Sequence, residues 1–231
     1  MTVPQHVAVI MDGNRRWAKR HGLPLVEGYR HGIAAFRNAI PATVERGIPV
    51  ATFWGFSTEN WRRSGEELDT LFGLFRHAVT ESLGWLKEHN ARLRISGRLH
   101  DFPEDLRRAA EKVIAATAGN SGIIVNLALS YGGRDEIQHV IRQVSSETAG
   151  DPKAIAAVDA ATVERHLYTA GLPDVDLVVR TGGERRLSGF LPWQAAYAEL
   201  YFTDTLWPDF NPQELDKALG DYASRKKNFG Q

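Results

Sequence analysis

Residues 6–17 read HVAVIMDGNRRW, a strand-length run that ends in a carboxylate, a glycine, an amide and two guanidinium groups. The run His6–Met11 lacks the alternation of a half-buried strand, so it is predicted to be a strand covered on both faces. Similar runs recur along the chain, with helical patterns between them. This order predicts an α/β fold with a mostly parallel, twisted sheet flanked by helices.

The other predicted elements alternate as far as the C-terminal region. Strands are expected at Val50–Trp54, Arg92–Ile95, Ile123–Leu129 and Leu177–Val179, and helices at Ile33–Arg46, Glu66–His89, Glu104–Ala116, Glu136–Thr148 and Pro212–Arg225. In the stretch 66–89, apolar residues recur at three- and four-residue steps, which indicates one apolar stripe on a helix. The sequence contains no repeat or linker, so residues 1–231 are predicted to form a single domain.

Composition restricts the classes of function. The 231 residues include 28 Lys+Arg and 28 Asp+Glu, so the formal net charge is zero. Nucleic-acid-binding proteins usually carry a basic excess, and no nucleic acid partner is expected. Cysteine is absent, which excludes disulfides, thiolate metal sites and cysteine nucleophiles. The sequence has no signal peptide, no membrane span and, in residues 227–231 (KNFGQ), no prenylation box; we expect a cytoplasmic protein.

Polar residues follow the predicted strands where these end. Asp12 follows the first strand, Ser57 and Asn60 follow the second, Ser130 ends the fourth and Arg180 ends the fifth. The carboxyl ends of the strands in an open parallel sheet form the ligand crevice. These side chains therefore predict a binding site at one edge of the sheet.

The segment Asp12–Trp17 suits a phosphate group. A helix N-terminus with adjacent arginine side chains binds anions, and a neighbouring aspartate is suited to Mg²⁺ that bridges to phosphate oxygens. The alternative is a plain turn in which Asp12 caps a helix.

Residues 180–188 (RTGGERRLS) form a second candidate anion site. The glycines allow close backbone approach, and Arg180, Arg186 and Ser188 supply donors. A solvated basic loop is the alternative. Two anion sites on one crevice predict two phosphorylated substrates. The sequence has no phosphate-binding loop, dinucleotide fingerprint or hydrolase elbow, which argues against a nucleotide-binding module.

Four blocks closely resemble the cis-prenyltransferase family, typified by undecaprenyl diphosphate synthase: HVAVIMDGNRRWA, FWGFSTENWRRS, NLALSYGGRDEI and DLVVRTGGERRLSGFLPWQAAYAELYFTDTLWPDF. They follow the family order and spacing from about residue 5 to residue 230. The resemblance implies an undecaprenyl diphosphate synthase-like fold and a Mg²⁺-dependent enzyme. Such an enzyme ionises an allylic diphosphate, lets the alkene of a second isoprenoid diphosphate attack the freed carbon, and then releases a proton.

The resemblance also implies roles for individual residues. Asp12, Ser57 and Asn60 would be catalytic, Asp12 and Glu199 would hold Mg²⁺, and Gly13, Asn14, Arg15, Arg16, Trp17, Tyr29, Trp61, Arg63, Arg180, Arg186 and Ser188 would bind substrate. The stripe of residues 66–89 would wall a tunnel for the prenyl tail. Family members are commonly homodimers, and Ala195–Trp207 resembles their subunit contact.

Some positions depart from the pattern of long-chain bacterial members. Leu25 and Tyr29 stand where those members have an arginine and a histidine that reach the donor diphosphate, and Arg185 stands where a histidine is frequent. A leucine does not replace a guanidinium group, so Arg16 or Arg30 would have to compensate.

Leu25, Tyr29, the Arg-Arg-Trp after Asp12, and Pro192 also resemble the lavandulyl-type branch, which joins isoprenoids head-to-middle. A weaker donor site suits a single condensation, because the product need not re-seat there. We therefore expect short irregular coupling of dimethylallyl diphosphate with geranyl or dimethylallyl diphosphate. Regular head-to-tail elongation with isopentenyl diphosphate, giving a polyprenyl or short Z-prenyl diphosphate, is the alternative, favoured by residues 56–61 (FSTENW) and the small Gly55.

A catalytically silent partner subunit related to this family is a different class of function. Such partners typically lose the aspartate and much of the phosphate-binding machinery. Asp12, Arg180, Arg186 and Ser188 are all present here, which favours an active enzyme.

Overall fold

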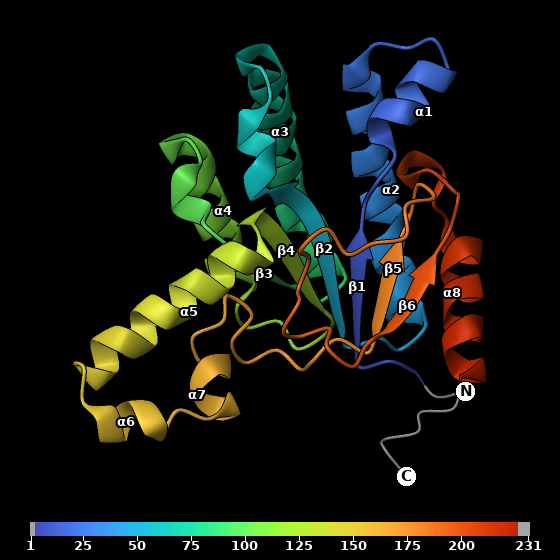
Figure 1. Cartoon of the computed structure of the whole chain (residues 1–231). Coiled ribbons are helices and arrows are strands. Elements are labelled where there is room, and N and C mark those ends of the chain that lie inside the picture. The colour runs from blue at the N-terminus through green and yellow to red at the C-terminus, as the bar shows by residue number, and fades with distance from the viewer. Residues whose placement is uncertain (1–2, 226–231) are drawn as a thin grey trace.

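The computed structural model describes residues 3–225, and its centre is a six-stranded sheet (Figure 1). The strands are β1 (His6–Ile10), β2 (Val50–Ser57), β3 (Arg92–Ser96), β4 (Ile124–Tyr131), β5 (Leu177–Arg180) and β6 (Glu199–Phe202). They lie in the order β3-β4-β2-β1-β5-β6, and each neighbouring pair is parallel. The predicted α/β fold with a parallel sheet is confirmed.

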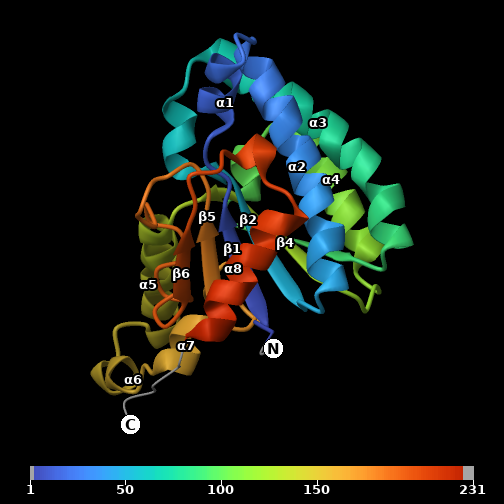
Figure 2. The ribbon, with the colours of Figure 1, turned by 90° about the vertical axis from the view of Figure 1, so that its right-hand side faces the viewer.

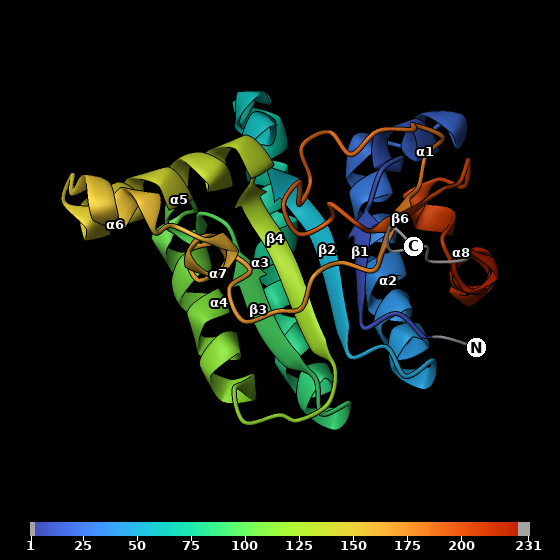
Figure 3. The same cartoon turned by 60° about the horizontal axis from the view of Figure 1, so that its bottom comes forward.

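Helices cover both faces of this sheet. They are α1 (Asn14–Arg20), α2 (Leu25–Glu45), α3 (Gly65–Glu88), α4 (Glu104–Thr117), α5 (Gly133–Thr148), α6 (Pro152–Ala156), α7 (Ala160–Glu164) and α8 (Pro212–Ser224), with short 3₁₀ turns η1 (Thr58–Arg62), η2 (Leu99–Asp101) and η3 (Trp207–Asp209). In Figure 2, α2, α3, α4 and α8 lie on one side of the strands and α5 lies on the other. Figure 3 shows α5, α6 and α7 near the β3–β4 edge, away from α8 at the β6 edge.

Alternation along β1 divides the core into two clusters. Val7 and Val9 join the cluster beneath α2 and α8, whereas Ala8 and Ile10 join the cluster on the opposite face. That opposite face is covered in part by the chain between β5 and β6, which contributes the fully buried Phe190. Strands buried on both faces explain the continuous apolar runs of the sequence.

Most predicted elements match the structure to within a few residues, and the differences have physical causes. The helix predicted at Ile33–Arg46 begins earlier, at Leu25 of α2. Pro24 precedes it as the N-cap residue with an extended backbone, so the helix starts directly after this proline. No range was predicted for α1 or for β6, a four-residue strand at the sheet edge. Residues 227–231 lie outside the described part of the chain. Among residues 3–225, no helix combines the length and apolar character needed to cross a bilayer.

The sheet order determines where a ligand can bind. The chain runs from β1 to β2 on one side, and β5 returns to the other side of β1. The carboxyl ends of strands beside such a reversal form an open crevice. Asp12 follows β1 and Arg180 ends β5, so both lie at this point of the sheet.

Candidate active site

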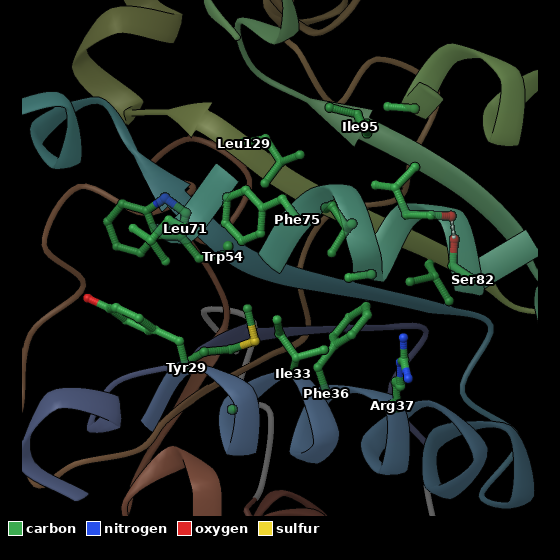
Figure 4. Close-up of a pocket in the computed structure, with 18 of the residues that line it drawn as sticks. Tyr29, Ile33, Phe36, Arg37, Trp54, Leu71, Phe75, Ser82, Ile95 and Leu129 are labelled. Atoms are coloured by element: carbon green, nitrogen blue, oxygen red, sulfur yellow. Dashed lines mark hydrogen bonds between the residues drawn. The ribbon is translucent and has the colours of Figure 1, made fainter. Parts of the chain in front are cut away.

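A cavity of about 400 Å³ lies between the sheet and helices α2, α3 and α4. Figure 4 shows Tyr29, Ile33, Phe36 and Arg37 of α2 facing Leu71, Phe75 and Ser82 of α3, with Trp54, Ile95 and Leu129 supplied by the strands. Most of the lining is apolar, as is usual for pockets that take small molecules. Leu71, Phe75, Val79 and Leu86 of the predicted apolar stripe line the cavity, and its use as a tunnel for the prenyl tail stays a prediction.

Polar side chains gather where this cavity meets the carboxyl edge of the sheet. This cavity mouth is formed by Asp12, Asn14, Ser57, Asn60, Arg63 and Arg180. These residues come from the ends of β1, β2 and β5, from the start of α1, and from η1 and the residue after it. The predicted clustering of strand-end residues is thus observed, apart from Ser130, which is buried and does not line the cavity.

Asp12 is held by two arginine side chains. Its Oδ1 lies 2.9 Å from Nη2 of Arg16, and its Oδ2 accepts a hydrogen bond of 3.0 Å from Nη2 of Arg180. Gly13, with φ of 121°, is the N-cap residue of α1, and no side chain caps that helix. The interpretation of Asp12 as a helix cap is therefore wrong. Gly13 fits here because a Cβ would lie 3.0 Å from Leu206.

Arg180 is only 5% exposed and is fixed at several points. Besides Asp12, it donates to the Ser188 hydroxyl at 2.9 Å and to the Arg186 carbonyl oxygen. Its Nε is buried and has no partner among residues 3–225. A pre-oriented guanidinium group with an unused N–H is suited to an anion.

Arg186 and Ser188 take part in this site differently from what was predicted. The Arg186 side chain is 62% exposed and pairs with Glu184, while its backbone carbonyl holds Arg180. Neither Arg186 nor Ser188 lines the cavity. In this structure both orient Arg180, and their direct binding of substrate stays a prediction.

Tyr29 lies in a polar cluster with Arg63 and Glu67, and Glu67 was not predicted from the sequence. Its hydroxyl donates to Oε1 of Glu67 at 2.7 Å and accepts a hydrogen bond of 3.0 Å from Arg63. Glu67 also lies 3.7 Å from Arg15. Burial, together with the hydrogen bond to Glu67, raises the pKa of Tyr29 to about 12, so the phenol keeps its proton near neutral pH. The Ser64-x-x-Glu67 pattern of a helix start would have indicated Glu67.

Of the lavandulyl-type positions, only Tyr29 reaches the cavity mouth directly. Leu25 packs in the same cluster as Tyr29 but lies outside the main cavity, and Pro192 packs against Gly133 at the start of α5. Arg30 pairs with Glu27 at 2.5 Å. Arg30 does not line the cavity, and its compensation for the arginine that long-chain members have at position 25 stays a prediction.

Ser57 and Asn60 lie together at the cavity mouth. The Ser57 backbone N–H donates to Oδ1 of Asn60 at 3.0 Å. Trp61 does not line the cavity and packs against Phe56 and Phe102 instead.

Trp17 also lies outside the cavity. Its indole donates to Asp209 at 2.7 Å and ties α1 to η3. Direct substrate contact by Trp17 and Trp61 stays a prediction.

Glu199 is not brought to Asp12 within one chain. It begins β6 and pairs in register with Leu177, whereas Arg180 pairs with Phe202 at the other end of the strand. Its carboxylate binds Arg225 at 2.7 Å. Within one chain the parallel register separates Glu199 from Asp12, and the role of Glu199 in holding Mg²⁺ stays a prediction.

The carboxylate of Asp12 fits a Mg²⁺ site that substrate phosphates complete. Residues 3–225 contain no group of three or more His, Cys, Asp or Glu that could hold a metal ion. Mg²⁺ is often bound by one or two carboxylates together with substrate phosphates. The side chain of Asp12 is 30% exposed and lines the cavity mouth, so it suits such a shared site.

The fold and the site define a protein with an apolar cavity whose polar mouth, at the carboxyl edge of a parallel sheet, carries arginine side chains and an aspartate. Residues 10–230 match the family described as "Putative undecaprenyl diphosphate synthase", and the chain belongs to this family. An isoprenyl transferase of Porphyromonas gingivalis is 46% identical over 228 residues, covering 99% of this chain and 90% of the relative. One of Heliobacterium mobile is 42% identical, with 99% and 88% covered.

Solved structures agree with this assignment. Lavandulyl diphosphate synthase from Lavandula x intermedia, in complex with dimethylallyl diphosphate, is 33% identical with a TM-score of 0.94, covering 99% of this chain and 98% of that one. A probable undecaprenyl diphosphate synthase from Campylobacter jejuni is 31% identical with a TM-score of 0.82 and full coverage of both chains. The protein is thus an isoprenyl transferase.

Proposed function

We propose that this enzyme joins two short isoprenoid diphosphates, releases diphosphate, and makes a product with a short tail. The volume of the cavity, about 400 Å³, carries this proposal. Pockets that take small molecules have volumes of about 300–1,000 Å³, so this cavity lies near the small end of that range. Its size suits a short tail better than a long polyprenyl chain.

The roles at the cavity mouth follow from charge and geometry. Arg180 and Arg16 would bind a diphosphate through charge-assisted hydrogen bonds. The apolar walls would keep water from the electron-poor carbon. Ser57 and Asn60 would orient the reacting carbons and assist loss of the proton. Mg²⁺, held by Asp12 and phosphate oxygens, would neutralise charge on the leaving diphosphate.

For the connectivity, the first candidate is head-to-middle coupling. The high structural similarity to lavandulyl diphosphate synthase supports it, as does Tyr29, whose phenol and Glu67 partner replace a cationic donor contact. A carboxylate beside Arg63 weakens anion binding at this position, which suits one condensation better than repeated elongation.

The second candidate is head-to-tail elongation with isopentenyl diphosphate. The curated isoprenyl transferases, at 42% to 46% identity, favour it. The Ser57–Asn60 arrangement is intact, as in the family's chain-elongating pattern. The short cavity would then limit the product to a few units.

Products from labelled dimethylallyl, isopentenyl, geranyl and farnesyl diphosphates, offered singly and in pairs, distinguish these candidates. We expect branched alcohols, after hydrolysis, from mixtures without isopentenyl diphosphate, measured by mass spectrometry and NMR. A ladder of linear polyprenols from farnesyl plus isopentenyl diphosphate would contradict the first candidate. Release of no diphosphate from any mixture with Mg²⁺ would contradict the proposed function itself.

Trp85 of α3 tests the limit on tail length. It lines the cavity and follows Ser82 by three residues on the same helix, and Figure 4 shows Ser82 at the same end of the cavity as Arg37. We expect Trp85→Ala to lengthen the longest tail found in the products by at least one isoprene unit, because the indole no longer fills that end. Trp85→Phe, which removes less volume, should give an intermediate result. Unchanged products from a folded Trp85→Ala variant would show that the tail does not reach this end.

We also infer a homodimer. In the block Ala195–Trp207, Tyr197 is 88% exposed, and the nearby Trp193 is 38% exposed. Aromatic residues are enriched in protein interfaces. Leu206 and Trp207 are buried in their own chain, so only the first part of the block is available for a subunit contact.

A further inference from the structure

Ser130 combines unusual backbone geometry with complete burial. It is a non-glycine residue with φ of 46°, in the left-handed region, and it is 0% exposed. The β2–β4 register pairs Phe56 with Leu129 and then Ser57 with Tyr131, so it passes over Ser130. Such a β-bulge re-aims the side chain of the extra residue. A strained residue beside an active site calls for a functional explanation.

The re-aimed hydroxyl of Ser130 links Trp61 to a carboxylate. It accepts a hydrogen bond of 2.9 Å from the Trp61 indole N–H and donates one of 2.7 Å to Oδ2 of Asp101. Asp101 is itself held by Arg98, whose Nε donates to the same oxygen at 2.7 Å. The hydroxyl therefore has both its donor and its acceptor partner, and the acceptor is anchored.

Trp61 belongs to the same 3₁₀ turn, η1, as Asn60. A short 3₁₀ segment has poor hydrogen-bond geometry of its own and depends on outside contacts. The indole provides such a contact, with its ring packed 5.1 Å from Phe56 and 5.3 Å from Phe102, centroid to centroid. Asn60, the preceding residue, binds the N–H groups of Ser57 and Arg63 through its side-chain and backbone oxygens, at 3.0 and 3.1 Å.

We propose that Ser130 is a positioning residue for the condensation, because its hydroxyl fixes Trp61 and thereby the turn that presents Asn60 to the cavity. The inference rests on the proposed function only in assigning Asn60 to the reaction. Ser130 does not line the cavity and acts through Trp61 alone.

Ser130→Gly and Ser130→Ala separate this role from a structural one. Both remove the hydroxyl, but glycine accepts a positive φ whereas alanine keeps the strain. We expect kcat to fall about tenfold in both variants, the effect of one hydrogen bond, with KM for both diphosphates nearly unchanged. The melting temperature should be higher for Ser130→Gly than for Ser130→Ala. A kcat that follows the melting temperature instead would overturn the proposal.

A double variant tests the route through the indole. Trp61→Phe keeps an aromatic ring but removes the N–H donor. Ser130→Gly added to Trp61→Phe should lower kcat no further than either single change, because both break the same contact. Multiplied losses would mean that Ser130 acts by another route.

Amide hydrogen exchange of the substrate-free protein tests the positioning without turnover. In Ser130→Gly, the amides of Ser57 and Arg63 should exchange about tenfold faster, while those of β1 stay unchanged. Unchanged exchange at Ser57 and Arg63 would contradict the proposal. If the wild-type protein turns over no substrate pair, the proposed function fails, and the exchange result still decides whether Ser130 holds the turn.

Discussion

Asp12→Asn is expected to lower turnover by about 10²–10³-fold, the usual effect of removing one group that stabilises developing charge. Asparagine keeps an oxygen that accepts from Arg16 and Arg180 but removes the negative charge suited to Mg²⁺. The Mg²⁺ concentration for half-maximal rate should rise together with this loss. Steady-state kinetics over a Mg²⁺ series measure both effects.

Asparagine is a better test than alanine because of Arg180. A residue at the edge of the sheet packs little, so on packing alone Asp12→Ala would leave the fold intact. The structure instead pairs Asp12 with a guanidinium group that is 5% exposed. Losing that partner leaves a buried guanidinium group without one of its acceptors, which costs about 1–3 kcal/mol of stability. Asp204→Asn, an exposed aspartate near Gly183, is the matched control, and near-normal turnover of Asp12→Asn would disprove the assignment.

Arg180→Lys is expected to raise KM for one of the two diphosphates about 10- to 100-fold, because lysine keeps the charge but loses the forked geometry. The resemblance to the cis-prenyltransferase family implies that this site binds the acceptor, the substrate that supplies the attacking alkene. Initial rates with each substrate varied in turn identify which KM changes. A rise in KM for the allylic donor alone would show that the two diphosphate sites are exchanged.

Arg186→Ala should have a smaller effect than Arg180→Lys. The Arg186 side chain is mostly exposed, and the backbone carbonyl that holds Arg180 survives the substitution. Arg108→Ala, which removes an exposed arginine from α4, controls for loss of positive charge far from the cavity mouth. A larger effect at Arg186 than at Arg180 would mean that the 184–188 segment moves onto the ligand.

Sequence patterns predicted the fold well wherever burial repeats along an element. The apolar runs of β1 and the stripe of α3 depend on the core, and burial sets their period. β6 gave no such signal, because its four residues are all only half buried at a sheet edge. The same holds for α1, a short helix whose residues bind polar partners at the crevice.

The site was predictable to the extent that strand ends converge. Asp12, Asn60 and Arg180 meet at the cavity mouth because they end or follow neighbouring strands. Trp17 belongs to the same motif as Asp12, yet its indole turns toward Asp209. Whether a motif residue faces a ligand or its own core depends on packing, which a single sequence does not contain.

The ion pairs of the cavity mouth have a consequence for ionic strength. The guanidinium groups of Arg15, Arg16, Arg63 and Arg180 already share two carboxylates, those of Asp12 and Glu67. An incoming anion therefore exchanges one negative partner for another rather than meeting bare charge. Added salt screens the ligand and loosens these internal pairs at the same time. Affinity should accordingly depend less on salt concentration than four unpaired arginine side chains would imply.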